Sequence, residues 1–234
     1  MAMGMATHGL CSPPSAFILC FRLRDGLEWG SARAVDRSTS QLTPTEPRTR
    51  YAIVVRLPRE VEVRIEDTFL AVIGATKPAM GYHLTILGPY CLAPGVTSPF
   101  LAAISRVCRQ AEPFTVRLAG LGVFRTTDNN AVYLKVADPA AVFALHERLL
   151  RATAGAALPE NERLRAWTVD NYNPHVTLGL GMSDDDLEEF LRHGEGRAIE
   201  AEFAVRQVWL VEQVLNGPWE VAAEYPLGVA PPPS

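Results

Sequence analysis

The apolar positions of residues 50–228 follow two different periods, and their succession predicts a chain of alternating strands and helices. Short runs rich in β-branched and aromatic residues predict strands over 51–57, 82–87, 114–124, 131–136, 175–180, 203–214 and 221–225. Apolar residues spaced three or four apart predict helices over 59–75, from 98 or 99 to 110, from Pro139 onward, and from Ser183 to Gly194. The order strand, helix, strand at the start of the domain recurs in the second half of the chain. We therefore predict an α+β fold with an internal duplication, in which two similar sheets face each other.

The two ends of the chain lack this regularity. Residues 1–49 are rich in Ser, Thr, Pro and Arg and show neither period, so we predict a disordered N-terminal extension. The folded domain is expected to span residues 50–228, with a Pro-rich tail over 229–234.

Composition and charge narrow the class of protein. A chain of 234 residues with 48% hydrophobic residues can bury a full core. Its net charge of −4 argues against a general nucleic-acid binder, so any nucleic acid must be held locally. The longest N-terminal apolar run, residues 16–21, is shorter than a signal-peptide core, and no run reaches the roughly 18 residues of a membrane span. The four cysteines form no C-x-x-C pair, which is typical of reduced thiols. We expect a cytoplasmic monomer with no membrane contact and no metal site.

Two short motifs carry the chemistry. His83 and Thr85 flank Leu84 in one predicted strand, and His175 and Thr177 flank Val176 in another. Since residues i and i+2 of a strand point to the same face, each motif presents an imidazole and a hydroxyl on one surface.

Paired imidazoles suit the cleavage of a phosphodiester. One can take a proton from water while the other gives a proton to the leaving oxygen, and hydroxyls can donate to the phosphate oxygens. Histidine titrates near neutrality, so both protonation states are available. The competing interpretation is two buried histidines that simply share hydrogen bonds with threonines. The repetition of the motif in apolar runs that both precede a glycine favours the catalytic interpretation.

The paired H-x-T motifs resemble those of the 2H phosphoesterase superfamily, and the chain is similar to its 2′-5′ RNA ligase-like branch, the RNA 2′,3′-cyclic phosphodiesterases. The resemblance covers residues 50 to about 228. It implies a bilobal fold of antiparallel-sheet lobes with outer helices around a central cleft, and cofactor-free opening of 2′,3′-cyclic phosphates, with reversible 2′-5′ joining of RNA ends in some members. It also implies that His83 is the general acid, His175 the general base, and Thr85 and Thr177 the phosphate-binding residues. One departure is that Leu178 to Gly181 follow the second motif, where many relatives carry a basic residue.

Residues near the motifs are further candidates for substrate contacts. Tyr82 and Tyr172 can stack on a base, and Arg125, in a predicted hairpin turn, can reach a second phosphate. Each also has a simpler structural interpretation. The two tyrosines can pack at the edge of a lobe, and Arg125 can be a solvent-exposed turn residue. His146 is expected on the surface of its helix, and His193 is expected near a helix C-terminus.

Three functions remain open at this point. The first is an enzyme that opens 2′,3′-cyclic phosphates on RNA ends or nucleotides. The second keeps the site but acts on a small signalling or ADP-ribose cyclic phosphate. The third is a non-catalytic module that binds RNA or a nucleotide, although pure binding does not need two proton-transfer groups.

Overall fold

The computed structural model describes residues 49–73, 78–92, 94–125, 129–158, 171–194, 197 and 199–228. The predicted N-terminal extension, apart from Thr49, and the predicted tail lie outside the described residues. The helices and strands follow in the order β1 (Thr49–Arg56), α1 (Arg59–Ile73), β2 (His83–Leu92), α2 (Thr97–Gln110), β3 (Phe114–Phe124), β4 (Asn130–Val136), α3 (Ala140–Thr153), β5 (Ala157–Leu158), β6 (His175–Met182), α5 (Asp184–Gly194), β7 (Glu200–Val205), β8 (Gln207–Val214) and β9 (Trp219–Pro226).

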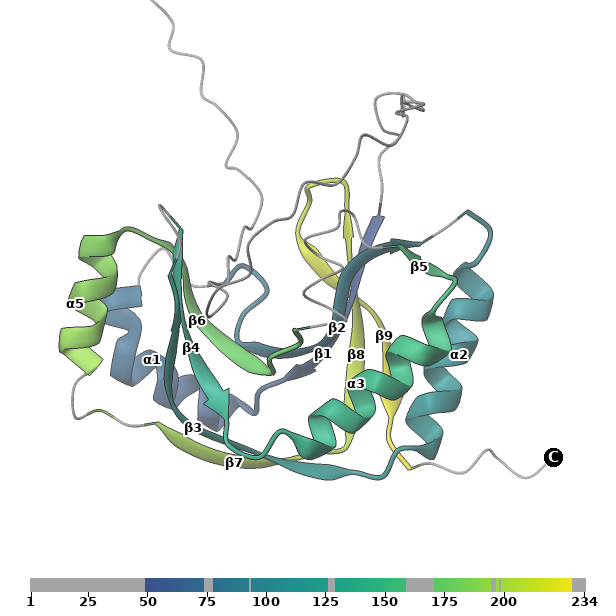
Figure 1. The fold of residues 1–234 in the computed structure, drawn as a ribbon, viewed down its shortest axis with the longest axis horizontal. Helices are drawn as coiled ribbons and strands as arrows, with labels where there is room; N and C mark the ends of the chain where they lie inside the picture. The colour runs from purple at the N-terminus through teal and green to yellow at the C-terminus, as the bar shows by residue number, and fades with distance from the viewer. Residues whose placement is uncertain are drawn as a thin grey trace, which may run out of the picture.

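The strands form one curled antiparallel sheet in the order β7-β3-β4-β6-β2-β1-β8-β9, with the short β5 paired to β2 (Figure 1). The predicted α+β class is confirmed. The two lobes are the halves of this sheet, which we call the β6 half (β7, β3, β4, β6) and the β2 half (β2, β1, β8, β9). They are therefore continuous, whereas the sequence predicted two separate sheets. The halves meet where β2 pairs with β6, at the partners Leu84 and Val176.

The four described helices cover the convex side of the sheet in two pairs. Helices α1 and α5 contact each other and lie behind the β6 half, while α2 and α3 contact each other and lie behind the β2 half. Helix α1 follows β1 of the β2 half in the chain, yet it packs against the other half. Helix α3 makes the reciprocal crossing, so the two halves are tied together by exchanged helices.

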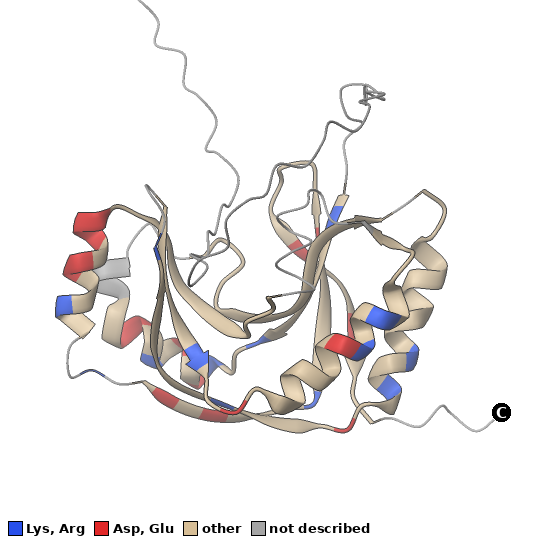
Figure 2. Cartoon of the chain, in the orientation of Figure 1, with Lys and Arg blue, Asp and Glu red and all other residues tan. Residues whose placement is uncertain are grey.

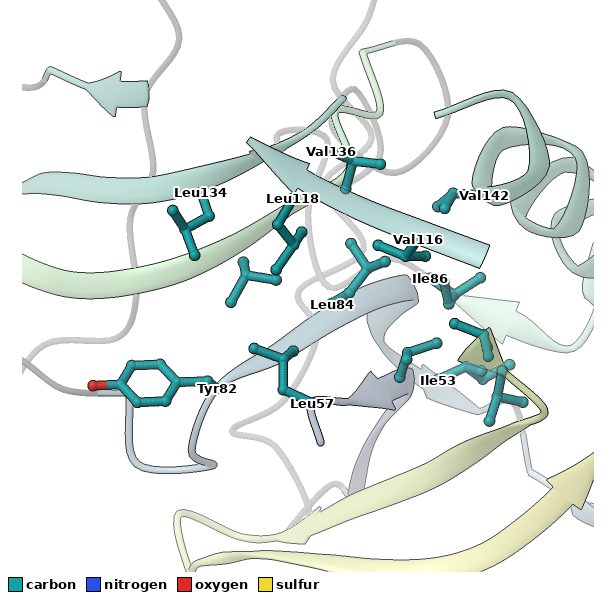
Figure 3. Packing of buried hydrophobic residues seen from close by; sticks show 14 of the residues in the cluster. Ile53, Leu57, Tyr82, Leu84, Ile86, Val116, Leu118, Leu134, Val136 and Val142 are labelled. Atoms are coloured by element: carbon teal, nitrogen blue, oxygen red, sulfur yellow. The ribbon is translucent and has the colours of Figure 1, made fainter. Parts of the chain in front are cut away.

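One apolar core fills the space between the helices and the convex face. Leu84, Leu118 and Leu134, from three different strands, are fully buried and point toward one another (Figure 3). Burying a leucine side chain stabilises the fold by about 2 kcal/mol. Because side chains alternate along a strand, residues next to these leucines point to the concave face.

Two predicted boundaries were wrong. Strand β2 continues to Leu92 through the cis peptide bond between Gly88 and Pro89, where the sequence predicted an end. The predicted strand 203–214 is divided at Arg206 into β7, which pairs with β3, and β8, which pairs with β1. The run thus crosses from one edge of the β6 half to the interior of the β2 half.

The predicted start and end of α5 are confirmed. The backbone N–H of Asp186 donates to Ser183 Oγ at 3.1 Å, and the Asp186 carboxylate accepts from the Ser183 N–H at 3.2 Å, which is a reciprocal capping arrangement. The Ser183 hydroxyl also donates to the Asp186 carboxylate, at 2.7 Å. This bond, together with the one from the Ser183 N–H, holds the pKa of Asp186 below its usual value. The helix ends at Gly194, with His193 in its last turn as expected. Among the described helices, none combines the length and apolarity that crossing a membrane would require.

Candidate active site

The pairing of β2 with β6 brings the two motifs together. Leu84 and Val176 are directly opposite each other and fully buried in the convex core. In an antiparallel pair, the residues on either side of such partners are also opposite each other and point to the other face. His83 therefore lies beside Thr177, and Thr85 lies beside His175. The structure thus gathers both histidines and both threonines, all half-buried, on the concave face at the junction of the two halves.

Each imidazole is held in the same way by its own chain. His83 Nδ1 lies 2.8 Å from the carbonyl oxygen of Gly81, and His175 Nδ1 lies 2.7 Å from that of Asn173. A carbonyl can only accept, so Nδ1 carries the proton and donates. In a neutral imidazole this assignment leaves the lone pair on Nε2, which is the atom available to take a proton.

Burial makes protonation of both rings costly. It lowers the pKa of His83 below its usual value, and the hydrogen bond to Gly81 partly offsets this effect. Burial also lowers the pKa of His175, to about 4; its hydrogen bond to Asn173 raises the pKa, and the positive charge of protonated His83 lowers it further. Protonation of one ring therefore disfavours protonation of the other, and a pair that holds a single proton offers an acid beside a base.

The depressed pKa of His175 should make the fold sensitive to acid. The pKa of about 4 in the folded state lies below the unfolded value of about 6.5, so the unfolded chain binds more protons between these pH values. The free energy of unfolding should therefore fall as pH decreases from 7 to 4, by about 3 kcal/mol from this group. Chemical denaturation at pH 7 and pH 4 should show that His175→Asn loses less stability than the wild type by about this amount. His193→Gln, which removes a histidine outside the site, should keep the acid sensitivity of the wild type; equal losses in all three proteins would contradict the pKa assignment.

An aromatic wall supports His175 on the β6 half. The His175 ring lies 5.0 Å from the ring centroids of both Phe124 and Tyr133, edge-on to Phe124, and these two rings stack at 4.2 Å. The ring of Tyr133 lies over Gly122 of β3, where an added Cβ would come within 2.2 Å of it. Phe124, Tyr133 and Gly122 were not predicted from the sequence to belong to the site. A glycine inside the apolar strand 114–124 was the available signal, since such a glycine often marks a close approach.

Gly122→Ala should displace Tyr133 and loosen the support of His175. The backbone of Gly122 is not in the left-handed region, so the cost comes from the overlap with the ring, and we expect about 1–3 kcal/mol of destabilisation. A double-mutant cycle with Tyr133→Ala, followed by chemical denaturation, isolates this contact. In the Tyr133→Ala background the same substitution should cost much less, and an unchanged cost would place its origin elsewhere.

Tyr82 does not reach the concave face. Its ring is 2% exposed and lies in the convex core beside Leu57 (Figure 3). Burial, with a smaller contribution from Glu66 and Glu62, raises the pKa of its hydroxyl to about 12. The buried ring is not available to stack on a base, and the simpler packing role expected for Tyr82 is the one observed. Tyr82 immediately precedes β2, and its side chain points to the face opposite that of His83.

Tyr172 has a structural role as well. Its ring stacks on that of His146 at 3.9 Å and meets that of Phe143 edge-on. Both of these residues belong to α3. Its hydroxyl donates to the backbone carbonyl of Thr85 at 2.8 Å. This is the simpler structural role expected for Tyr172, since the residue helps to position the strand that carries Thr85. Base stacking by Tyr172 stays a prediction.

His146 is buried, with 3% exposure, which corrects the expectation that it lies on the surface. Its Nδ1 lies 2.7 Å from the carbonyl oxygen of Ile86, so the histidine ties α3 to β2. Arg125 is exposed at the end of β3, and its predicted phosphate contact stays a prediction.

Basic residues stand beside the histidines, although none follows the second motif. Arg56 of β1 is the register partner of His83, and Lys135 of β4 is the register partner of His175. Directly opposite residues point to the same face, so both exposed side chains extend over the concave face. Each histidine therefore has a cation on one side and a threonine hydroxyl on the other. Within the described ranges, no three His, Cys, Asp or Glu side chains gather in a way that could hold a metal ion, and the metal-independent mechanism stays a prediction.

A curled antiparallel sheet with two H-x-T motifs at its centre defines the class of this protein. The sequence model of the 2′-5′ RNA ligase superfamily matches residues 74–217, a range that includes both motifs, and the chain belongs to this superfamily. A Bacillus pumilus protein that bears the name phosphoesterase is 30% identical over 146 residues, which are 62% of this chain and 79% of that protein. A similarly named protein of Halalkalibacterium halodurans is 23% identical over the same shares of the two chains.

Solved structures share the fold. A Thermus thermophilus protein has a TM-score of 0.57 at 22% identity, over 76% of this chain and 98% of that one. Escherichia coli LigT in complex with 3′-AMP has a TM-score of 0.55 at 18% identity, over 78% and 99%. The match to the superfamily model over residues 74–217 confirms the sequence-based recognition of the 2H phosphoesterase superfamily, and the solved structures agree with its fold.

Proposed function

We propose that this protein is a metal-independent phosphodiesterase that opens 2′,3′-cyclic phosphates on RNA ends or nucleotides. The observation that carries the proposal is the arrangement of His83, Thr85, His175 and Thr177 around the centre of the β2–β6 pair. Membership of the phosphoesterase superfamily supports the reaction class, and the complex of LigT with 3′-AMP supports a nucleotide substrate.

The two imidazoles of a singly protonated pair take complementary roles. Neutral His175 takes a proton from water through Nε2 as the water oxygen attacks phosphorus. One ester bond of the ring breaks, and protonated His83 gives its Nε2 proton to the leaving ribose oxygen. The product is a phosphate monoester beside a free hydroxyl. The hydroxyls of Thr85 and Thr177 donate to the non-bridging oxygens, where negative charge increases in the transition state.

Turnover of 2′,3′-cyclic mononucleotides and of oligonucleotides with a cyclic-phosphate end, measured in excess EDTA, tests the proposal. We expect monoester products at a rate that EDTA does not change. A folded wild-type protein that turns over none of these substrates would refute the function. Turnover that EDTA abolishes and added metal restores would refute the mechanism.

A further inference from the structure

The β2 half carries a second set of aromatic and basic side chains beyond the histidines. We call Arg50, Arg56, Trp209 and Trp219 the outer platform. The guanidinium carbon of Arg56 lies 5.9 Å from the ring centroid of Trp209, and that of Arg50 lies 5.9 Å from the centroid of Trp219. Each tryptophan of the platform thus lies beside a positive charge.

The strand register connects the outer platform to the active site. Arg56 is the partner of His83. Val54 is the partner of Thr85 on one side and of Trp209 on the other, so Trp209 lies two strands, about 10 Å, from Thr85.

The far end of the platform lies along the same strands. Gln213 is the partner of both Arg50 and Trp219. Arg50 is four residues from Val54, or about 13 Å along β1. The platform therefore begins beside the catalytic histidines and leads away from them.

Buried apolar side chains lie beneath the two indole rings. Ala52, Val54 and Val211 are buried, and Trp209 and Trp219 pack against them while remaining half-buried themselves. Small residues below and an exposed portion of ring above are what a stacking surface requires. This apolar patch is separate from the convex core.

The charge near the platform favours an anionic chain. Arg56 is exposed and forms no ion pair with any carboxylate of the described residues. Glu224 of β9 is the register partner of Trp209 and the acid nearest to it in the sheet. Glu212 of β8 and Glu220 of β9 are register partners of each other, and they alternate along their strands with Gln213 and Trp219, so they point to the opposite face. Further acids lie on α5, α1 and β7, outside the β2 half (Figure 2). Positive charge interleaved with aromatic rings is typical of surfaces that bind single-stranded nucleic acid.

We infer that the outer platform binds the single-stranded RNA chain whose terminal cyclic phosphate occupies the active site. Bases of the chain stack on Trp209 and Trp219, and its phosphates contact Arg56 and Arg50. The inference rests on the proposed function and narrows its substrate class to oligonucleotide ends, in preference to mononucleotides.

Comparison of a cyclic-phosphate-ended trinucleotide with a mononucleoside 2′,3′-cyclic phosphate tests the inference. The wild type should have at least about tenfold higher kcat/KM for the trinucleotide. Trp209→Ala should lower the value for the trinucleotide about tenfold and leave the mononucleotide within about twofold, while Trp209→Phe should restore most of the loss. Arg56→Gln should reduce the slope of log kcat/KM against log salt concentration by about 0.7 for the trinucleotide, the value of one phosphate contact to a single strand.

Matched controls separate the platform from the fold and from the chemistry. Arg192→Gln makes the same change of charge on α5 and should leave the salt slope unchanged. Equal losses on both substrates in Trp209→Ala, or a trinucleotide no better than the mononucleotide, would overturn the inference while leaving the proposed function intact. If neither substrate is turned over, binding of a trinucleotide 3′-phosphate, measured by tryptophan fluorescence, still tests the platform: binding that Trp219→Ala weakens supports it, and no binding overturns it.

Discussion

His83→Asn and His175→Asn should each lower kcat/KM for a 2′,3′-cyclic phosphate by at least about 10²-fold. Removing an imidazole deletes a general acid or base, and such a group contributes about 10²–10⁴-fold. Asparagine is chosen because its amide N–H can replace the imidazole Nδ1–H as the donor to the carbonyl of Gly81 or Asn173. The strand should therefore keep its conformation while the reactive Nε2 is lost. Steady-state kinetics with circular dichroism of each variant provides the measurement.

The matched control is His193→Gln. His193 Nε2 lies 3.1 Å from the carbonyl oxygen of Thr68, and a glutamine amide can take over this contact far from the site. This variant should retain wild-type kcat/KM. The double variant His83→Asn with His175→Asn should be little worse than either single variant, because the two groups act in one proton-transfer step. A single variant that keeps more than about a tenth of the activity would remove that histidine from the chemistry.

The motif strands were predictable because the residues that define each motif are close together in the sequence. His83 and Thr85 are two residues apart in an apolar run, and so are His175 and Thr177, so strand alternation alone places each pair on one face. The direct pairing of Leu84 with Val176 was not predictable from one sequence, since register depends on which strands meet and 92 residues separate the two.

Features that the sequence did not reveal share one physical origin. Tyr82, Tyr172 and His146 were interpreted from their neighbours in the chain, but their environments are set by elements distant in sequence. Tyr172 binds the carbonyl of Thr85, 87 residues away, and His146 binds that of Ile86, 60 residues away. The division at Arg206 has the same cause, because an apolar run does not reveal that its two parts pair with different strands.

Contacts from neighbouring strands also explain why the basic residues were missed. Arg56, Lys135 and Trp209 belong to three strands separated by helices and loops, and only the sheet order makes them neighbours of the motifs. A basic residue was sought immediately after His175 in the chain. The fold supplies the charge from the adjacent strands instead, and it does so on both sides of the site.

The pH dependence of kcat/KM should show an optimum between about 4 and 6.5, with activity falling about tenfold per pH unit on the alkaline side. The reaction needs one protonated and one neutral imidazole. The pKa of His175 is about 4 and that of His83 is below its usual value, so the free enzyme holds a single proton on the pair only in this acidic window.

Bound substrate should shift this optimum in a definite direction. In the proposed mechanism the anionic phosphate lies between the two rings, so it should favour the protonated form and raise the pKa of the pair in the complex. The optimum of kcat should therefore lie at higher pH than that of kcat/KM, because kcat reports the complex and kcat/KM the free enzyme. Both profiles can be recorded with one mononucleoside cyclic phosphate across pH 4 to 9. A kcat/KM that rises continuously to pH 9 would contradict the acid role of His83. At that pH no protonated imidazole remains to give a proton to the leaving oxygen.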